Sequence, residues 1–89
     1  MSEAMNMRDP EERRFRTVVA NFFTAFAFTD SRLHEIRADP RSAFLEIAMY
    51  MAQNFPDDFD LLNRGFADRL IRVRARDMLI QRNLRNTIN

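Results

Sequence analysis

The chain has 89 residues, enough for one small domain, and its 14 basic and 13 acidic side chains leave a net charge of +1. A domain of this size buries only about 60–65% of its unfolded surface, so its core is modest and a second copy or a partner would add stability. Without Cys there are no disulfides, thiolate nucleophiles or Cys-based zinc sites, and no apolar run is long enough to span a bilayer, so we expect a cytoplasmic protein without membrane contact.

The N-terminal part of the chain contains a clear helix start. Residues 1–8 have neither apolar periodicity nor a cap, and we interpret them as a flexible tail before a single helical domain over residues 9–89. Asp9 is the predicted N-cap and is followed by Pro10 at the first helical position, which opens a variant of the capping box. Apolar residues then recur at helical intervals, which predicts an amphipathic helix over residues 10–28. These apolar residues are Phe15, Val18, Val19, Phe22 and Phe26.

Two further helices follow in the middle of the chain. A cluster of capping residues at positions 29–31 starts a short second helix, which ends near Ala38 because Pro40 disfavours a helical conformation at the residue before it. Asp39 and Pro40 repeat the earlier cap-then-proline signal and predict a third helix that runs through Ala52. Apolar residues cover nearly the whole circumference of this third helix. Such a helix is typically central, covered by neighbouring helices or by a second subunit.

The fourth predicted helix begins near residue 57 and meets Gly65, the only glycine of the chain. This glycine either kinks the helix or separates a short helix from a long one. After it, the apolar residues form two stripes, so we expect two packing surfaces, one toward the core and one toward a partner chain. The first stripe contains Phe66, Leu70, Val73, Ile80 and Leu84, and the second contains Ala67, Ile71, Ala75 and Met78.

The predicted fold class follows from these elements. No segment shows the alternation of apolar and polar residues, or the hairpin turns, that are typical of strands. We therefore expect an all-α fold: a small helical bundle of three main helices plus one short helix, completed by oligomerisation. Nine Phe and six Met are a large apolar content for such a small domain, and they suit a self-complementary interface as well as a core.

Arginine is concentrated near the C-terminus. Residues 64–89 hold seven of the fourteen arginines and only two acids, a charge of +5, whereas residues 34–63 carry a charge of −4. The basic helix can pair with the acidic segment of its own chain, with a second copy, or with a foreign anion such as nucleic acid. Three arginines share one edge of the helix, namely Arg69, Arg72 and Arg76. The absence of Lys indicates a GC-rich bacterial or phage genome, although Arg also recognises carboxylate and phosphate by paired hydrogen bonds.

Little in the chain predicts catalysis. His34 is the only histidine, and we interpret it as a surface residue. The acidic run at residues 57–60 lacks the alternating ligands, central Gly and terminal Glu of a calcium-binding EF-hand loop, so it is interpreted as a helix N-terminus. No phosphate-binding loop, nucleophile elbow or zinc-protease motif is present. We therefore expect no enzymatic activity, no metal and no cofactor.

These features favour a small protein–protein interaction module: an adaptor, inhibitor or accessory subunit that acts as a homodimer or larger assembly on a larger protein partner. The alternative is a regulatory protein that binds nucleic acid with the arginine-rich C-terminal helix. Against the alternative, no aromatic residue interleaves the arginines and no helix-turn-helix pattern fits the spacing. The predicted partner-binding residues are four arginines and whichever of four apolar side chains stay exposed: Arg69, Arg72, Arg74, Arg76, Phe23, Phe28, Ile71 and Met78.

Overall fold

A computed structural model describes the backbone of residues 9–88 and the side chains of residues 9–86. The predicted flexible tail, residues 1–8, lies outside these residues. Within them the chain forms helices and short connections and contains no strand, so the all-α prediction is confirmed. The elements in chain order are the α-helix α2 (Pro10–Ala25), α3 (Asp30–Ala38), the 3-10 helix η1 (Pro40–Ala43), α4 (Phe44–Asn54), the 3-10 helix η2 (Pro56–Asn63) and α5 (Ala67–Ile88).

The predicted caps position the first two helices. The Asp9 carboxylate accepts a hydrogen bond from the backbone N–H of Glu11 at 2.9 Å and satisfies one of the free donors of α2. The Thr29 hydroxyl accepts one from the backbone N–H of Arg32 at 3.1 Å and does the same for α3. The helix α3 ends at Ala38, as the following proline predicts. Local chemistry therefore determines where these two helices begin and where the second ends.

The structure corrects two predicted boundaries and decides between two alternatives for a third. The first helix ends at Ala25 and not at residue 28, because the chain becomes extended at Phe26 and the following turn returns Phe28 to the core. The third helix starts with the 3-10 turns of η1 before the α-helix α4. In the fourth, the region of Gly65 separates the short helix η2 from the long helix α5, which is the second of the two predicted alternatives.

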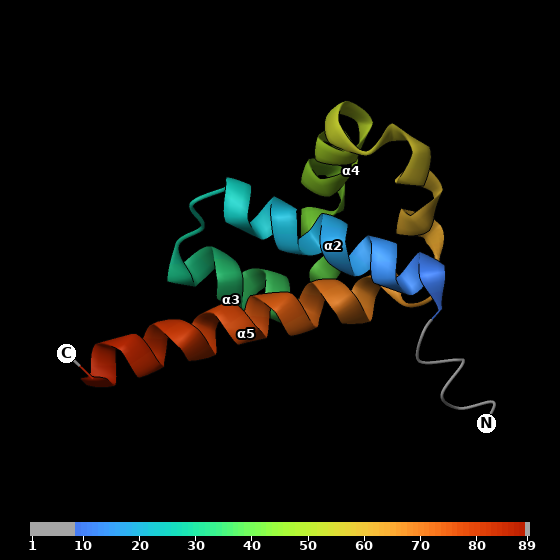
Figure 1. Ribbon diagram of the computed structural model, residues 1–89. Coiled ribbons are helices and arrows are strands. Elements are labelled where there is room, and N and C mark those ends of the chain that lie inside the picture. The colour runs from blue at the N-terminus through green and yellow to red at the C-terminus, as the bar shows by residue number, and fades with distance from the viewer. Residues whose placement is uncertain (1–8, 89) are drawn as a thin grey trace, which may run out of the picture.

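The helices α2 and α3 pack on α5, whereas α4 does not contact it (Figure 1). The helix α2 runs alongside the first part of α5, and α3 packs on the part that follows. The helix α4 rises from this layer and contacts α2, and η2 returns beside α4 to the start of α5. The C-terminal end of α5 extends beyond the rest of the helices (Figure 1). Both α2 and α3 thus cover α5, whereas α4 has neighbours on only part of its circumference.

The core draws on every helix, and an aromatic cluster centred on Phe22 of α2 forms part of it. The Phe22 ring is fully buried, and its centroid lies 4.8–5.6 Å from four other rings. Those rings belong to Phe23, Phe26, Phe28 and Tyr50. Tilted and edge-to-face contacts of this kind add about 0.5–1.5 kcal/mol per pair beyond the burial of apolar area. The aromatic cluster therefore joins α2, the turn after it and α4.

One broad inward face of α5 replaces the two predicted stripes. Its buried residues are Ala67, Leu70, Ile71, Ala75 and Leu79. Leu70 comes from the first predicted stripe, and the three residues Ala67, Ile71 and Ala75 come from the second. Leu79 belongs to neither stripe. Because α2 and α3 pack on α5 from two sides, the buried arc is wider than either stripe. Ile80 and Leu84, assigned to the first stripe, are instead exposed.

Candidate functional site

Arginines near the start of α5 bind acids at the start of α2. Arg64 donates to both carboxylate oxygens of Glu11, from Nε at 3.1 Å and from Nη2 at 3.3 Å. Arg69 donates to Glu12 at 3.4 Å. The acids of the first turn of α2 therefore have two roles: they face the positive end of the helix dipole and they bind a second helix.

The remaining arginines of α5 also bind mostly within the chain. Arg72 donates to the backbone carbonyl of Arg37 at 3.0 Å, and Arg76 binds Asp77 at 3.1 Å. Arg82 donates to the Asp30 carboxylate at 2.5 Å and to the Phe28 carbonyl at 2.7 Å. Apart from Asp77, these partners lie in α2, in α3 and in the turn between them. The basic helix is thus engaged largely by the first part of its own chain.

The acidic segment over residues 34–63 pairs mainly with other arginines. Asp58 accepts a hydrogen bond from Arg14 at 3.0 Å, and both Glu35 and Glu46 bind Arg32. The basic helix therefore pairs within its own chain, but not with the acidic segment over residues 34–63. Its acidic partners Glu11, Glu12 and Asp30 lie before that segment.

The ion pair of Arg64 and Glu11 predicts a pH dependence. Hydrogen bonding to Arg64 lowers the pKa of Glu11 below its ordinary value of 4.5. A lowered folded-state pKa means that the pair stabilises the fold above about pH 4.5 and that this contribution is lost as the pH falls through the lowered pKa. We expect Arg64→Ala to return the pKa of Glu11 toward 4.5 in a carboxyl ¹³C NMR titration. Arg72→Ala, which removes a bond to a carbonyl, should leave that pKa unchanged, and an unchanged value in Arg64→Ala would contradict the pairing.

The structure separates the predicted partner-binding residues into two groups. Arg69, Arg72 and Arg76 are exposed, and Arg74 and Met78 are half-buried. The predicted role of Phe23, Phe28 and Ile71 in a partner surface is corrected, because all three lie in the core. Phe23 and Phe28 belong to the aromatic cluster, and Ile71 lies on the inward face of α5. None of these three side chains is available to a partner.

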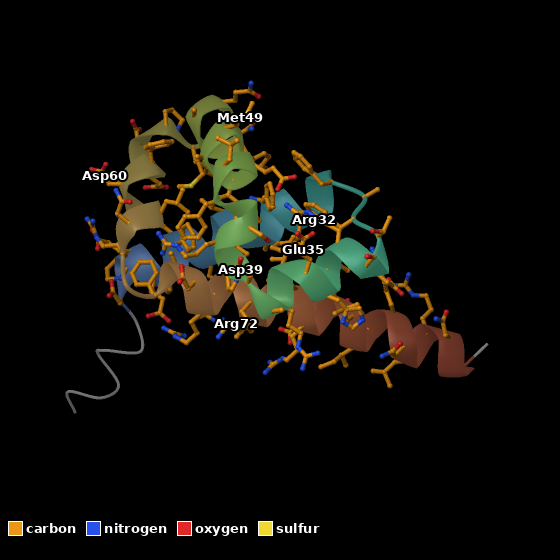
Figure 2. The ribbon with its side chains drawn as sticks, turned by 180° about the vertical axis from the view of Figure 1, so that it is seen from behind. Arg32, Glu35, Asp39, Met49, Asp60 and Arg72 are labelled. Atoms are coloured by element: carbon orange, nitrogen blue, oxygen red, sulfur yellow. The ribbon has the colours of Figure 1, made fainter. Side chains whose placement is uncertain are left out.

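A different apolar surface lies on α4. Only Ile47 and Met51 of this helix are fully buried, whereas 74% of Leu45 and 58% of Met49 are exposed. Figure 2 shows Met49 projecting outward from α4. The prediction that neighbouring helices surround this helix is therefore wrong, and cover by a second subunit remains as the other alternative. Its all-round apolar character was the sequence signal for this surface.

A pocket adjoins these exposed side chains. It has a volume of about 390 Å³ and lies between the end of α2 and the outer side of α4. Its lining consists of Phe26, Glu46, Met49, Tyr50, Gln53 and Asn54. We define the α4 surface as this pocket together with Leu45. Large exposed apolar side chains beside a hollow are typical of a protein-docking surface.

Arg32 neutralises the one charged residue of this pocket. From α3 it binds the Glu46 carboxylate of α4, the Glu35 carboxylate at 2.8 Å and the Ser42 carbonyl at 3.1 Å, and Figure 2 shows Arg32 close to Glu35. Burial alone would lower the pKa of Arg32, but its hydrogen bonds to Glu35 and Glu46 outweigh burial and raise it. The one charged residue of the α4 surface is therefore ion-paired, with an arginine that it shares with Glu35.

Other candidate sites receive no support from the described residues. Among them no group of three or more His, Cys, Asp or Glu side chains is placed to hold a metal ion, and His34 is exposed. Within residues 9–88, no helix is long and apolar enough to cross a bilayer. Comparison of the chain with protein-family models, curated proteins and solved structures finds no match.

Proposed function

We propose that the protein is a non-enzymatic interaction module that self-associates as a homodimer through the α4 surface. One observation carries the proposal: Leu45, which is 74% exposed, stands beside an apolar pocket of about 390 Å³. In water this surface exposes apolar area that a second protein would bury.

The shape of the α4 surface favours a second copy as the occupant. A two-fold interface brings the same patch of both subunits together, so each patch must supply both a projection and a hollow. Leu45 and Met49 supply the projections, and the adjacent pocket supplies the hollow. Rotation about a two-fold axis across α4 would place the projecting side chains of each copy over the pocket of the other.

Charge also favours self-association through α4 over self-association through α5. The only charged pocket residue, Glu46, is bound by Arg32 within the same chain. Two copies of this surface therefore meet without repulsion between unpaired charges. By contrast, the arginines of α5 have partners within the chain but are not fully neutralised, because Arg72 binds a carbonyl and Arg69 shares Glu12 with Arg16. Two copies of that face would therefore repel each other. Its excess positive charge suits a foreign acidic surface, and the face remains free in a dimer formed through α4.

The expected dimer is of moderate affinity. Burying the exposed parts of Leu45 and Met49 on two copies would contribute on the order of 4–8 kcal/mol. The translational and rotational entropy lost when two molecules associate offsets a large part of this free energy. With the other pocket residues contributing, we expect a dissociation constant in the micromolar range, near about 1–100 µM.

Charge insertion into the α4 surface tests the proposal. We expect Leu45→Glu and Met49→Glu to weaken dimerisation about 100-fold or more, because each would bury an unpaired carboxylate in the interface. Sedimentation velocity over about 1–500 µM protein would measure the dissociation constant of the wild type and set at least a lower limit on that of each variant. The matched control is Ile80→Glu, since Ile80 is an exposed apolar residue of α5 and should leave the dimer intact. A wild-type protein that stays monomeric throughout, or a dimer insensitive to both α4 variants, would refute this function.

Nucleic-acid binding is the second candidate function. The observation in its favour is that Arg69, Arg72 and Arg76 stay exposed on α5. Each of them, however, already has an acceptor within the chain, which a phosphate would have to replace. A phosphate backbone gains less from arginines that must first leave an intramolecular partner. We therefore rank this function below self-association and action on a protein partner.

A further inference from the structure

A second, smaller pocket lies between α2 and α5. It has a volume of about 90 Å³, and its lining consists of Arg16, Val19, Leu70, Val73, Arg74 and Asp77. Three of these residues are aliphatic and three are charged. The pocket shares no residue with the α4 surface.

Arg74 gives this pocket an unsatisfied donor. Its Nε–H is buried and has no hydrogen-bond acceptor among the described residues. No carboxylate of those residues pairs with it, in contrast to the neighbouring arginines Arg69 and Arg76. A buried donor that lacks an acceptor is energetically unfavourable, and more so when the group is charged. An anionic oxygen in the pocket would remove that cost.

The acids near the pocket are already neutralised. Asp77, in the pocket wall, is bound by Arg76 at 3.1 Å. Glu12, one turn before Arg16 on α2, is shared between Arg16 at 2.9 Å and Arg69 at 3.4 Å. Around the pocket there are thus four arginines, Arg16, Arg69, Arg74 and Arg76, against two acids, which leaves an excess charge of +2. The pocket therefore attracts an anion although an aspartate lines it.

We propose that this pocket binds one small phosphate group, either inorganic phosphate or the terminal phosphate of a monoester. Arg74 donates its Nε–H to a phosphate oxygen, and Arg16 supplies a second guanidinium at the rim. Guanidinium groups are well suited to phosphate because their planar N–H donors match its oxygens. The volume of about 90 Å³ exceeds the space that a single water molecule needs, so the pocket has room for a group of a few heavy atoms such as phosphate. The aliphatic walls strengthen the attraction by lowering the local dielectric constant.

A phosphate titration followed by ¹H–¹⁵N NMR tests the proposal directly. Sodium phosphate, added against sodium chloride at the same ionic strength, should shift the Arg74 Nε–H signal and nearby backbone amides of α2 and α5 in a saturable way. Methyl phosphate should bind like inorganic phosphate, whereas dimethyl phosphate, a diester with one charge, should bind at least about 10-fold more weakly. Equal shifts with chloride, shifts spread over all arginines, or equal binding of the diester would overturn the proposal.

Two substitutions make this test specific. Arg74→Lys keeps the positive charge but removes the Nε–H donor, and it should weaken phosphate binding about 10-fold or more. Arg85→Lys is the matched control, because Arg85 is exposed on the same helix and lies outside the pocket. Unchanged binding in Arg74→Lys, or equal weakening in both variants, would contradict a site built on Arg74. The Leu45→Glu variant should bind phosphate normally, so failure of the dimer proposal and failure of this one can be distinguished.

Discussion

Replacement of Phe22 by Ala is expected to lower the free energy of unfolding by about 3–5 kcal/mol. Phe22 is fully buried, and its ring contacts four other aromatic rings from α2, from the turn after it and from α4. Its removal leaves a cavity where these segments meet. A domain of this length typically has a total stability of about 4–13 kcal/mol, so the variant should lose a large share of it. Urea denaturation followed by helical circular dichroism would measure the change.

Phe26→Ala is the matched control for Phe22→Ala. Phe26 lies one turn further on, contacts the same cluster, and is 39% exposed. Because its ring is partly in water already, its removal should cost only about 1 kcal/mol. Both variants should be compared at low protein concentration, where self-association does not add to stability. Equal losses for the two variants would contradict the burial of Phe22.

The chain sequence predicts those parts of the fold that depend on local interactions. The caps at Asp9 and Thr29 and the stop imposed by Pro40 act within a few residues, so their effects are readable from the sequence. The 3-10 conformation of η1 and η2 is not signalled in this way. A 3-10 helix has tighter turns and poorer hydrogen-bond geometry than an α-helix. In short segments such as η1 and η2, tertiary packing decides between the 3-10 and the α conformation.

The partners of the arginines could not be predicted from charge counts. Arg64, Arg69 and Arg82 bind acids that lie 53, 57 and 52 residues earlier in the chain. Segment charges indicate that a basic helix needs acidic partners, but they do not show which acids the packing of α2 and α3 brings near. The sequence places Arg69, Arg72 and Arg76 on one edge of the helix, but the intramolecular bonds of these arginines become visible only in the structure.

The α4 surface illustrates the limit of pattern analysis for a functional site. Leu45 and Ile47 are equally apolar and lie two positions apart, yet 74% of the first and none of the second is exposed. On a helix that is apolar all round, periodicity cannot indicate which side the neighbours cover. The helix α4 contacts α2, η1 and η2, and this tertiary arrangement buries Ile47 but leaves Leu45 and Met49 exposed.

On α5, Ile71 is buried and Ile80 is exposed, although the two residues are chemically identical. This pair allows a direct test of which face of α5 forms the core. Ile71→Ala is expected to destabilise the monomer by about 2–5 kcal/mol, because the side chain is fully buried on the inward face of α5. Ile80→Ala, the same change on the same helix at a side chain that is 47% exposed, should cost less than about 1 kcal/mol. Thermal and urea unfolding would measure both. If Ile71 instead belonged to an apolar stripe that faces a partner chain, its substitution would weaken association and spare the monomer. Loss of monomer stability in Ile71→Ala but not in Ile80→Ala would place the intramolecular core on the inward face of α5 and leave its arginine-bearing outer face free for a foreign partner.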